Sequence, residues 1–266
     1  MPEINLFCSS NISYGAINKS TLGSQFSVAF PEPIRIPSTA KNVKVWCHSL
    51  GTFYTYPNIS PALQNNIIYF TDDTANYQKY PIVLPKGLYS VDLLSDQIAL
   101  ALNASGFDSN AVVLSGNLAT QKVIFTFNSS GYALYFKTNE SPYELLGLNA
   151  EDKVPSSGLA PTAGVQYSAP NIANFGALES LALQCSLVNT AYNNGRVSQV
   201  LASIPINVGA GQNIIYEPSN LIKVDAPNLV GSTISTVTFT LCDQNLNPLD
   251  TNEDDYSLRV VIAYDL

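Results

Sequence analysis

The chain has 266 residues, of which 46% are hydrophobic and only 12% are charged, and its formal net charge is −8 at pH 7. This acidic balance argues against nucleic-acid binding, which needs clustered Lys and Arg, because the twelve basic residues are scattered. No apolar run reaches the roughly 18 residues that a membrane span needs. The first ten residues lack the basic and apolar regions of a signal peptide, so we expect a globular protein that is not secreted.

The first quarter of the chain alternates like β-sheet. In the segment "SQFSVAFPEPIRIP", Phe26, Val28 and Phe30 alternate with small or polar residues until Pro31 and Pro33 interrupt the pattern. The segment "NVKVWCHSLGTFYTYPNIS" is also predicted to be a strand. It places Val43, Val45 and Cys47 on one face and Lys44 and Trp46 on the other. A third short apolar run, "NNIIYFTDD", completes this strand-rich part.

A helix is predicted over residues 91–105. Ser90 is a good N-cap, Asp92 lies in the positively polarised first turn, and Gly106 ends the helix. Apolar residues recur on one face at Val91, Leu94, Ile98, Ala101 and Leu102. Because so short a helix is marginal alone, we expect it to pack on the strands that follow, "NAVVLSG", "QKVIFTFNS" and "YALYFKT". The sequence thus predicts a small α+β subdomain at residues 78–168 that the helix covers, with a flexible return path over 154–170.

The carboxy-terminal part again reads as short strands. Inward faces are predicted at alternating residues of three segments: Leu181, Leu183, Cys185 and Leu187; Val237, Phe239 and Leu241; Leu258, Val260, Ile262 and Tyr264. Many short strands at this spacing are typical of a sandwich, barrel or jelly roll. We therefore predict a mainly β protein, with residues 1–77 and 169–266 forming one β-domain around the inserted subdomain.

Motifs for chemistry are sparse. His48 is the only histidine, and it follows Cys47 in a strand, so the two side chains point to opposite faces and cannot act as a nucleophile and its base. No phosphate-binding glycine motif occurs. We predict no catalytic residue and no cofactor. The four cysteines, Cys8, Cys47, Cys185 and Cys242, lack metal-ligand spacing and are expected to be buried free thiols.

One acidic loop partly matches a calcium-binding motif. Asp250, Asn252 and Asp254 occupy the first, third and fifth positions of a calcium loop. The match then fails, because Asp255 replaces the turn glycine and Val261 replaces the bidentate Glu. Two hypotheses remain open for this loop, a solvated hairpin connection and a weak calcium site.

Three stretches resemble, in the same order, parts of the penton or minor capsid proteins of virophages and polinton-like (Maverick) viruses. They are "LPKGLYSVDLLSDQIALALN" with "QKVIFTF" and "SPYELLGL", then "LALQCSLVN" with "GRVSQVLASIPI", and finally "ISTVTFTLCDQNLNPLDTNEDDYSLRVVIAY". The resemblance covers residues 80–266. It implies a single jelly roll whose five copies fill the vertices of an icosahedral shell built mainly from a double jelly-roll major capsid protein. It carries over no catalytic residues.

This resemblance agrees with a surface made largely of uncharged polar residues, which suits contacts between copies of one chain. We expect a homopentamer in the virion, made in the host cytoplasm or nucleus, with residues 1–20 as an arm that reaches a neighbour. Other hypotheses are a receptor- or glycan-binding spike or fibre protein, a compact trimeric jelly-roll major capsid protein and, least favoured, a β-sandwich enzyme. A host receptor or glycan is a further possible partner, whereas nucleic acid is not.

Overall fold

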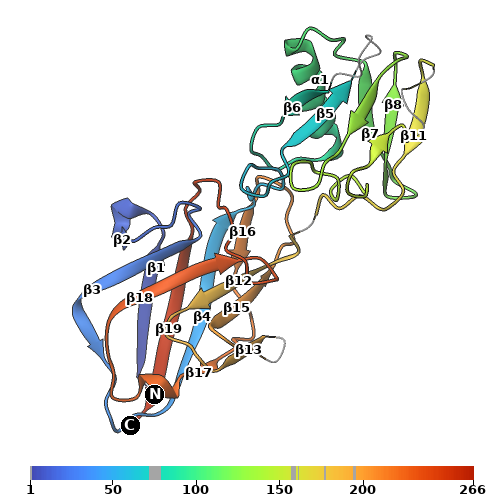
Figure 1. Cartoon of the computed structure of the whole chain (residues 1–266). Helices are drawn as coiled ribbons and strands as arrows, with labels where there is room; N and C mark the ends of the chain where they lie inside the picture. Colours follow the sequence, from blue (N-terminus) through green and yellow to red (C-terminus); the bar gives the residue numbers. More distant parts are fainter. Residues whose placement is uncertain (1, 72–78, 157–159, 161, 177, 194–195) are drawn as a thin grey trace. The chain divides into compact units, whose positions relative to one another are not determined.

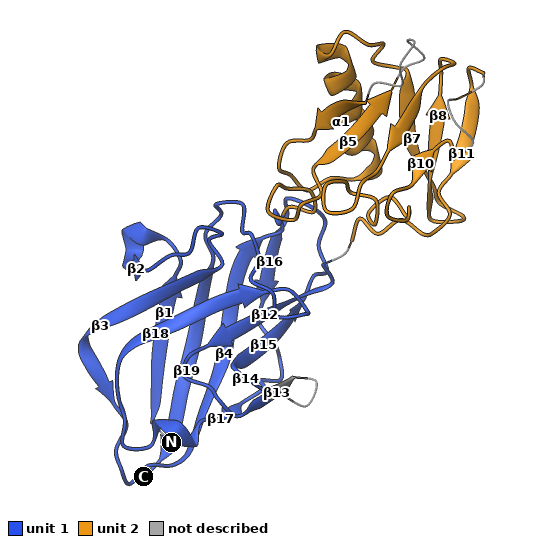
Figure 2. Cartoon of the chain, viewed as in Figure 1, with its two compact units in different colours: residues 1–56, 178–266 blue, residues 57–177 orange. Residues whose placement is uncertain are grey.

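The computed structural model describes residues 2–71, 79–156, 160, 162–176, 178–193 and 196–266. The chain divides into two compact units, shown in separate colours in Figure 2. Unit 1 comprises residues 1–56 and 178–266, and unit 2 comprises residues 57–177. The chain thus leaves unit 1 once and returns to it once.

Unit 1 consists mainly of two antiparallel sheets (Figure 1). The first has the order β1 (Glu3–Ser9), β19 (Ser257–Asp265), β4 (Lys41–Phe53) and β16 (Asn213–Tyr216), and β17 (Val224–Asp225) also pairs with β4. The second has the order β15 (Val200–Pro205), β12 (Ser180–Cys185), β18 (Thr233–Cys242), β3 (Gln25–Arg35) and β2 (Ala16–Ile17). A hairpin of β13 (Ala191–Asn193) and β14 (Arg196–Ser198) and two 3-10 turns, η1 (Ile12–Tyr14) and η2 (Pro227–Leu229), complete the described elements of this unit.

The strand order is that of a jelly roll. The eight main strands of unit 1 in chain order are β1, β3, β4, β12, β15, β16 together with β17, β18 and β19. β16 and β17 count as one interrupted strand because both pair with β4. In chain order, the first, eighth, third and sixth strands of unit 1 then form one sheet, and the fifth, fourth, seventh and second form the other. Consecutive strands therefore alternate between the two sheets, except that the fourth and fifth strands, β12 and β15, pair within one sheet, and this is the double Greek-key pattern. The prediction of a mainly β jelly-roll sandwich is confirmed. Unit 2 is inserted between the third strand, β4, and the fourth, β12.

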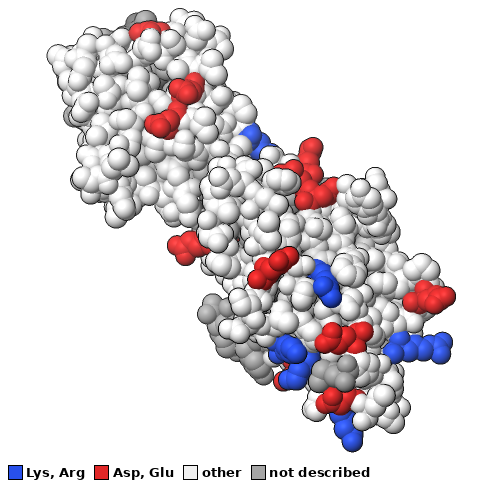
Figure 3. Space-filling model, turned by 180° about the vertical axis from the view of Figure 1, so that it is seen from behind, with Lys and Arg blue, Asp and Glu red and all other residues white. Residues whose placement is uncertain are grey.

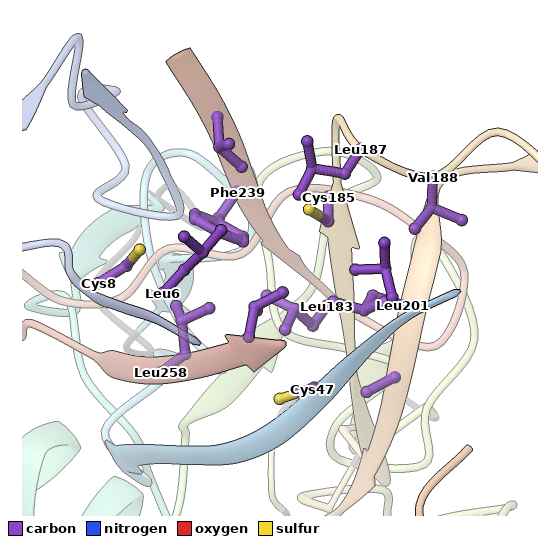
Figure 4. Packing of buried hydrophobic residues seen from close by; sticks show 14 of the residues in the cluster. Leu6, Cys8, Cys47, Leu183, Cys185, Leu187, Val188, Leu201, Phe239 and Leu258 are labelled. Atoms are coloured by element: carbon purple, nitrogen blue, oxygen red, sulfur yellow. The ribbon is translucent and has the colours of Figure 1, made fainter. Parts of the chain in front are cut away.

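The core of unit 1 lies between the two sheets and is built by the alternation of side chains along each strand. Phe26 is fully buried, with its ring centroid 5.5 Å from that of Phe239 and 5.2 Å from that of Tyr256. Figure 4 shows side chains from several strands in this core, among them Leu6, Leu183, Phe239 and Leu258. The inward faces predicted for β12, β18 and β19 contribute to this core, and so do the alternating apolar residues of β3 and the Val43, Val45 and Cys47 face of β4.

The amino-terminal segment is not the free arm that was expected for residues 1–20. Residues 3–9 form β1, which pairs along its whole length with β19, and residues 16–17 pair with β3. Leu6 and Cys8 are buried in the core, whereas Phe7 between them points outward. The prediction of an arm was wrong because the apolar alternation of Ile4, Leu6 and Cys8 requires a sheet to cover it.

Unit 2 has its own core between two small sheets and one helix. One sheet has the order β10 (Lys153–Val154), β9 (Ala133–Tyr135), β5 (Ile67–Thr71) and β6 (Tyr80–Val83). The other has the order β11 (Val165–Ser168), β8 (Lys122–Phe127) and β7 (Val112–Asn117), and the helix is α1 (Val91–Ala104). Leu94, Ile98 and Leu102 of α1 are fully buried, which agrees with the stripe predicted for this helix.

Two hydrogen bonds fix α1. The Ser90 hydroxyl accepts the Leu93 N–H at 3.3 Å, which caps the amino terminus of the helix. In the middle of the helix, the buried Ser95 hydroxyl accepts the N–H of Leu114 in β7 at 2.9 Å. The helix is therefore part of the packing of unit 2, as the sequence indicated.

The bounds of unit 2 differ from those expected for the inserted subdomain. Unit 2 begins at residue 57 instead of 78, because β5 lies between β6 and β9 of this unit. It ends at residue 177 instead of 168. The stretch 154–170, expected as a flexible return path, contains β11, which pairs with β8 over four residues.

Candidate interaction surface

A groove crosses the outer face of the first sheet of unit 1. Its floor is a row of cross-strand neighbours, in which Ser9 pairs with Ser257, Ser257 with Gly51, and Gly51 with Ile215. Because three of these four residues are Ser or Gly, the row leaves space above the backbone. The resulting hollow has a volume of about 460 Å³, and its lining comprises Phe7, Cys8, Ser9, Tyr14, Ser49, Leu50, Gly51, Ile215, Glu217, Ser257, Leu258 and Arg259.

Large apolar side chains along this floor and around it are exposed to solvent. The exposed fraction is 75% for Phe7, 81% for Tyr14 and 67% for Ile215. A second hollow of about 260 Å³ shares Ser9, Tyr14, Gly51 and Ser257 with the first and extends it to Phe53. Single exposed apolar residues are normal, but several around one hollow mark an interaction surface. We call this surface the sheet groove.

Phe7 is held in place by its neighbours. The Arg259 guanidinium donates from Nε and Nη2 to the Asn5 side-chain oxygen, at 3.0 and 2.8 Å. The same guanidinium lies 5.3 Å from the centre of the Phe7 ring, within the range of a cation–π contact. One wall of the sheet groove is therefore ordered before any partner arrives, which lowers the entropic cost of binding.

The other wall depends on an anchored turn. The Asp255 carboxylate accepts hydrogen bonds from Ser10 Oγ at 3.0 Å, Asn11 Nδ2 at 2.6 Å and Lys19 Nζ at 2.6 Å. Asn11 in turn caps η1, since its side-chain oxygen accepts the N–H of Ser13 at 2.8 Å. These contacts hold the turn that carries Tyr14.

We expect Asp255→Asn to destabilise unit 1 by about 1 kcal/mol at neutral pH, the value for a charge-assisted hydrogen bond after discounting for solvent exposure. Burial alone would raise the pKa of Asp255, but the hydrogen bonds from Lys19, Ser10 and Asn11 outweigh it and lower the pKa below its usual value. The stabilisation is therefore complete above the unfolded pKa of about 3.9 and is lost as the pH falls through the lower folded value.

Urea unfolding of the wild type and of Asp255→Asn between pH 7 and pH 2 tests this expectation. The difference in unfolding free energy should be largest at pH 7 and should shrink at the acidic end. A difference that stays constant across the whole range would show that the Asp255 charge contributes nothing.

The structure assigns contacts to each of the calcium candidates. The N–H of Asn252 donates to the Asp250 carboxylate at 2.9 Å, the backbone of Asp250 bridges to Gly23, and Asp254 accepts a hydrogen bond from the Thr55 hydroxyl. Among the described residues, no three His, Cys, Asp or Glu side chains are grouped so that they could hold a metal ion. For Asp250, Asn252 and Asp254, a solvated loop stays the prediction and weak calcium binding stays the alternative hypothesis.

All four cysteines are buried free thiols, as expected. Burial raises the pKa of Cys8 and Cys242 to about 11 and that of Cys47 and Cys185 to about 12. Since the thiolate is the reactive form, these groups are inert as nucleophiles at neutral pH. Three of them, Cys8, Cys47 and Cys185, belong to the jelly-roll core in Figure 4. His48 is half-buried in β4.

Sequence reasoning missed the sheet groove. Its four floor residues come from β1, β4, β16 and β19, which are far apart along the chain, so no local motif marks them. A signal was present in the first strand, because Phe7 breaks the polar face formed by Glu3 and Asn5. An aromatic residue on the polar face of a strand indicates a surface for contact.

Comparison with solved structures gives a distant structural likeness. No protein-family model and no curated protein matches the chain. Among solved structures, a crystal structure of the selenomethionine-labelled mavirus penton protein is similar, at 10% sequence identity and a TM-score of 0.47, with all of both chains covered. Because this similarity is weak, the assignment of unit 1 as a jelly roll rests on its strand order alone. No helix among the described residues is long and apolar enough to cross a membrane.

Proposed function

We propose that this chain is a structural protein of a virus, a penton or minor capsid protein whose five copies form a ring at each five-fold vertex of an icosahedral capsid. The observation that carries the proposal is a jelly roll whose outer sheet face has an ordered apolar groove. Jelly rolls of this double Greek-key kind serve as capsid and lectin domains. The virion is then the site of action, and a double jelly-roll major capsid protein is the neighbouring partner.

The sheet groove fits a second copy of the same chain. A ring of identical subunits needs two different surfaces that meet head to tail. The groove offers one of them, and Arg259 and Glu217 in its lining balance in charge, which suits an uncharged apolar partner. On the face shown in Figure 3, most of the surface is likewise uncharged. Exposed apolar side chains elsewhere on unit 1, among them Val197, Ile222 and Val230, are candidates to enter the groove of the next copy.

The mass of the purified protein in solution, measured by size-exclusion chromatography with light scattering, tests this proposal. We expect a particle of five times 28.7 kDa, in slow exchange with the monomer at low concentration. The double variant Phe7→Ser with Ile215→Ser should shift the mass to that of the monomer. Its unfolding midpoint should stay close to that of the wild type, because both side chains are exposed.

Leu118→Ser is the matched control, since Leu118 is 95% exposed, belongs to unit 2 and is not among the residues that line the sheet groove. It should leave the pentamer intact. A stable trimer would contradict the vertex role and favour a trimeric major capsid protein. A wild-type chain that stays monomeric at high concentration and is not incorporated into shells would contradict a capsid role altogether.

A further inference from the structure

A row of aromatic and basic side chains crosses the outer face of one sheet of unit 2. Lys153 of β10 pairs with Tyr135 of β9, Tyr135 pairs with Tyr69 of β5, and Tyr69 pairs with Pro81 of β6. The neighbours of Tyr69 along its strand, Ile68 and Phe70, are fully buried in the core. Because side chains alternate along a strand, the row from Lys153 to Pro81 faces outward.

Three ammonium groups lie on the two tyrosine rings of this row. Lys79 Nζ is 4.1 Å and Lys153 Nζ is 5.0 Å from the centre of the Tyr135 ring. Lys137 Nζ is 4.0 Å from the centre of the Tyr69 ring. All three distances are within the range of a cation–π interaction, which holds the lysine heads on the sheet. A quarter of the twelve basic residues of an acidic chain is thus concentrated on one small surface.

Two glutamates near this row already have hydrogen-bond partners, and those of Glu140 belong to the row and its lysines. Glu140 accepts a hydrogen bond from the Tyr69 hydroxyl and lies 3.6 Å from Lys137 Nζ. Glu151 accepts the N–H and the hydroxyl of Thr138, at 2.9 and 3.0 Å. Hydrogen bonding with Tyr69, together with the charge of Glu140, raises the pKa of Lys137, so this lysine stays charged at neutral pH.

Lys79 and Lys153 form no ion pair within 4.0 Å among the residues that the structure describes, and the charge of Glu151 acts on Lys79 only from beyond that distance. Lys137 is paired with Glu140, so Lys79 and Lys153 are the two lysines of this face that can offer their charge to a ligand. A long polyanion such as nucleic acid would also meet the net charge of −8 of the chain, whereas a ligand with one acid group meets only the local cations. Tyrosine side chains add flat apolar surface and hydroxyl groups next to these cations.

We propose that the face formed by Lys79, Lys137, Lys153, Tyr69 and Tyr135 binds an acidic saccharide. The acid group of the sugar pairs with Lys79 and Lys153, and the sugar ring lies along the two tyrosines. A carboxylate, as in a sialylated glycan, and a sulfate ester share this chemistry. The proposal adds a ligand site to the structural role and does not depend on it, because it concerns unit 2 alone.

Saturation-transfer NMR and calorimetry on the full chain with sialyllactose, sulfated lactose and plain lactose test this site. We expect at least one acidic sugar to bind and plain lactose to bind at least tenfold more weakly. The double variant Lys79→Gln with Lys153→Gln should weaken the acidic sugar at least tenfold. Lys79→Arg with Lys153→Arg keeps both charges and should retain most of the binding.

Lys223→Gln in unit 1 is the matched control, because Lys223 Nζ also lies over an aromatic ring, 4.5 Å from the centre of Trp46. It should leave the affinity unchanged. Binding of sialyllactose alone identifies a carboxylate ligand, and binding of sulfated lactose alone identifies a sulfate ligand. Absence of binding, equal binding of plain lactose, or full affinity in the double Gln variant would overturn the proposal, and none of these results would alter the mass of the assembly.

Discussion

Deleting residues 2–9 should prevent unit 1 from folding cooperatively. These residues include β1, whose seven residues all pair with β19, and they bury Leu6 and Cys8 in the jelly-roll core. Each large apolar side chain gains about 1.5–3 kcal/mol on burial. The deletion also leaves the edge of β19 unpaired. The summed loss is comparable to the total stability of about 5–15 kcal/mol that a domain of this kind has. Circular dichroism and urea unfolding of the truncated chain measure the effect.

Two neighbouring positions in β1 provide a sharper form of this test. Leu6→Ala should cost about 2–5 kcal/mol, because Leu6 is buried and its removal leaves a cavity. Phe7→Ser should change the stability of the monomer by no more than about 0.5 kcal/mol, because Phe7 is exposed on the other face. If the truncated chain unfolded at the wild-type urea midpoint, the segment would be a dispensable arm and its place in the sheet would be wrong.

Inward faces were predictable wherever a strand alternates strictly. In β18, Val237, Phe239 and Leu241 alternate with threonines, and all three lie in the core. Leu258, Val260 and Ile262 of β19 also lie in this core, whereas Val261 and Ala263 between and after them are buried in a separate small cluster. The period of two is a local property of a strand, so a single segment contains all the information that fixes which residues face inward.

Strand partners were not predictable in the same way. The segment around Ile68 and Phe70 reads as a strand like those before it, and it was assigned to the β-domain that precedes it along the chain. In the structure it pairs with β6 and with β9, more than sixty residues later. Pairing depends on contacts between distant segments, which local alternation does not encode.

The sheet groove could not be predicted for a related reason. Ser9, Gly51, Ile215 and Ser257 become neighbours only through the order of β1, β19, β4 and β16. In sequence each is an unremarkable small or apolar residue. The acidic loop, by contrast, attracted attention as a partial motif, and the structure shows Asp255, which had broken the motif, accepting hydrogen bonds from three other side chains.

A fragment of residues 57–177 should fold by itself, whereas a fragment of residues 78–168 should not. The shorter fragment lacks β5, the strand between β6 and β9, and with it the fully buried Ile68 and Phe70. It also lacks Asn58, whose side chain donates to the Tyr89 carbonyl at 2.8 Å and accepts the Tyr89 N–H at 2.8 Å. Proton NMR dispersion and thermal unfolding of both fragments measure the difference.

Point variants of the 57–177 fragment show whether the packing of β5, and not only the length of the fragment, determines its stability. Phe70→Ala should destabilise it by about 3–5 kcal/mol, because the ring is fully buried and contacts the rings of Phe107 and Tyr132. Leu118→Ser, at an exposed position of the same unit, should have little effect. If the 78–168 fragment gave dispersed resonances and a cooperative unfolding transition, β5 would contribute its stability to the jelly roll and not to unit 2. The boundary of unit 2 would then have to move back toward residue 78.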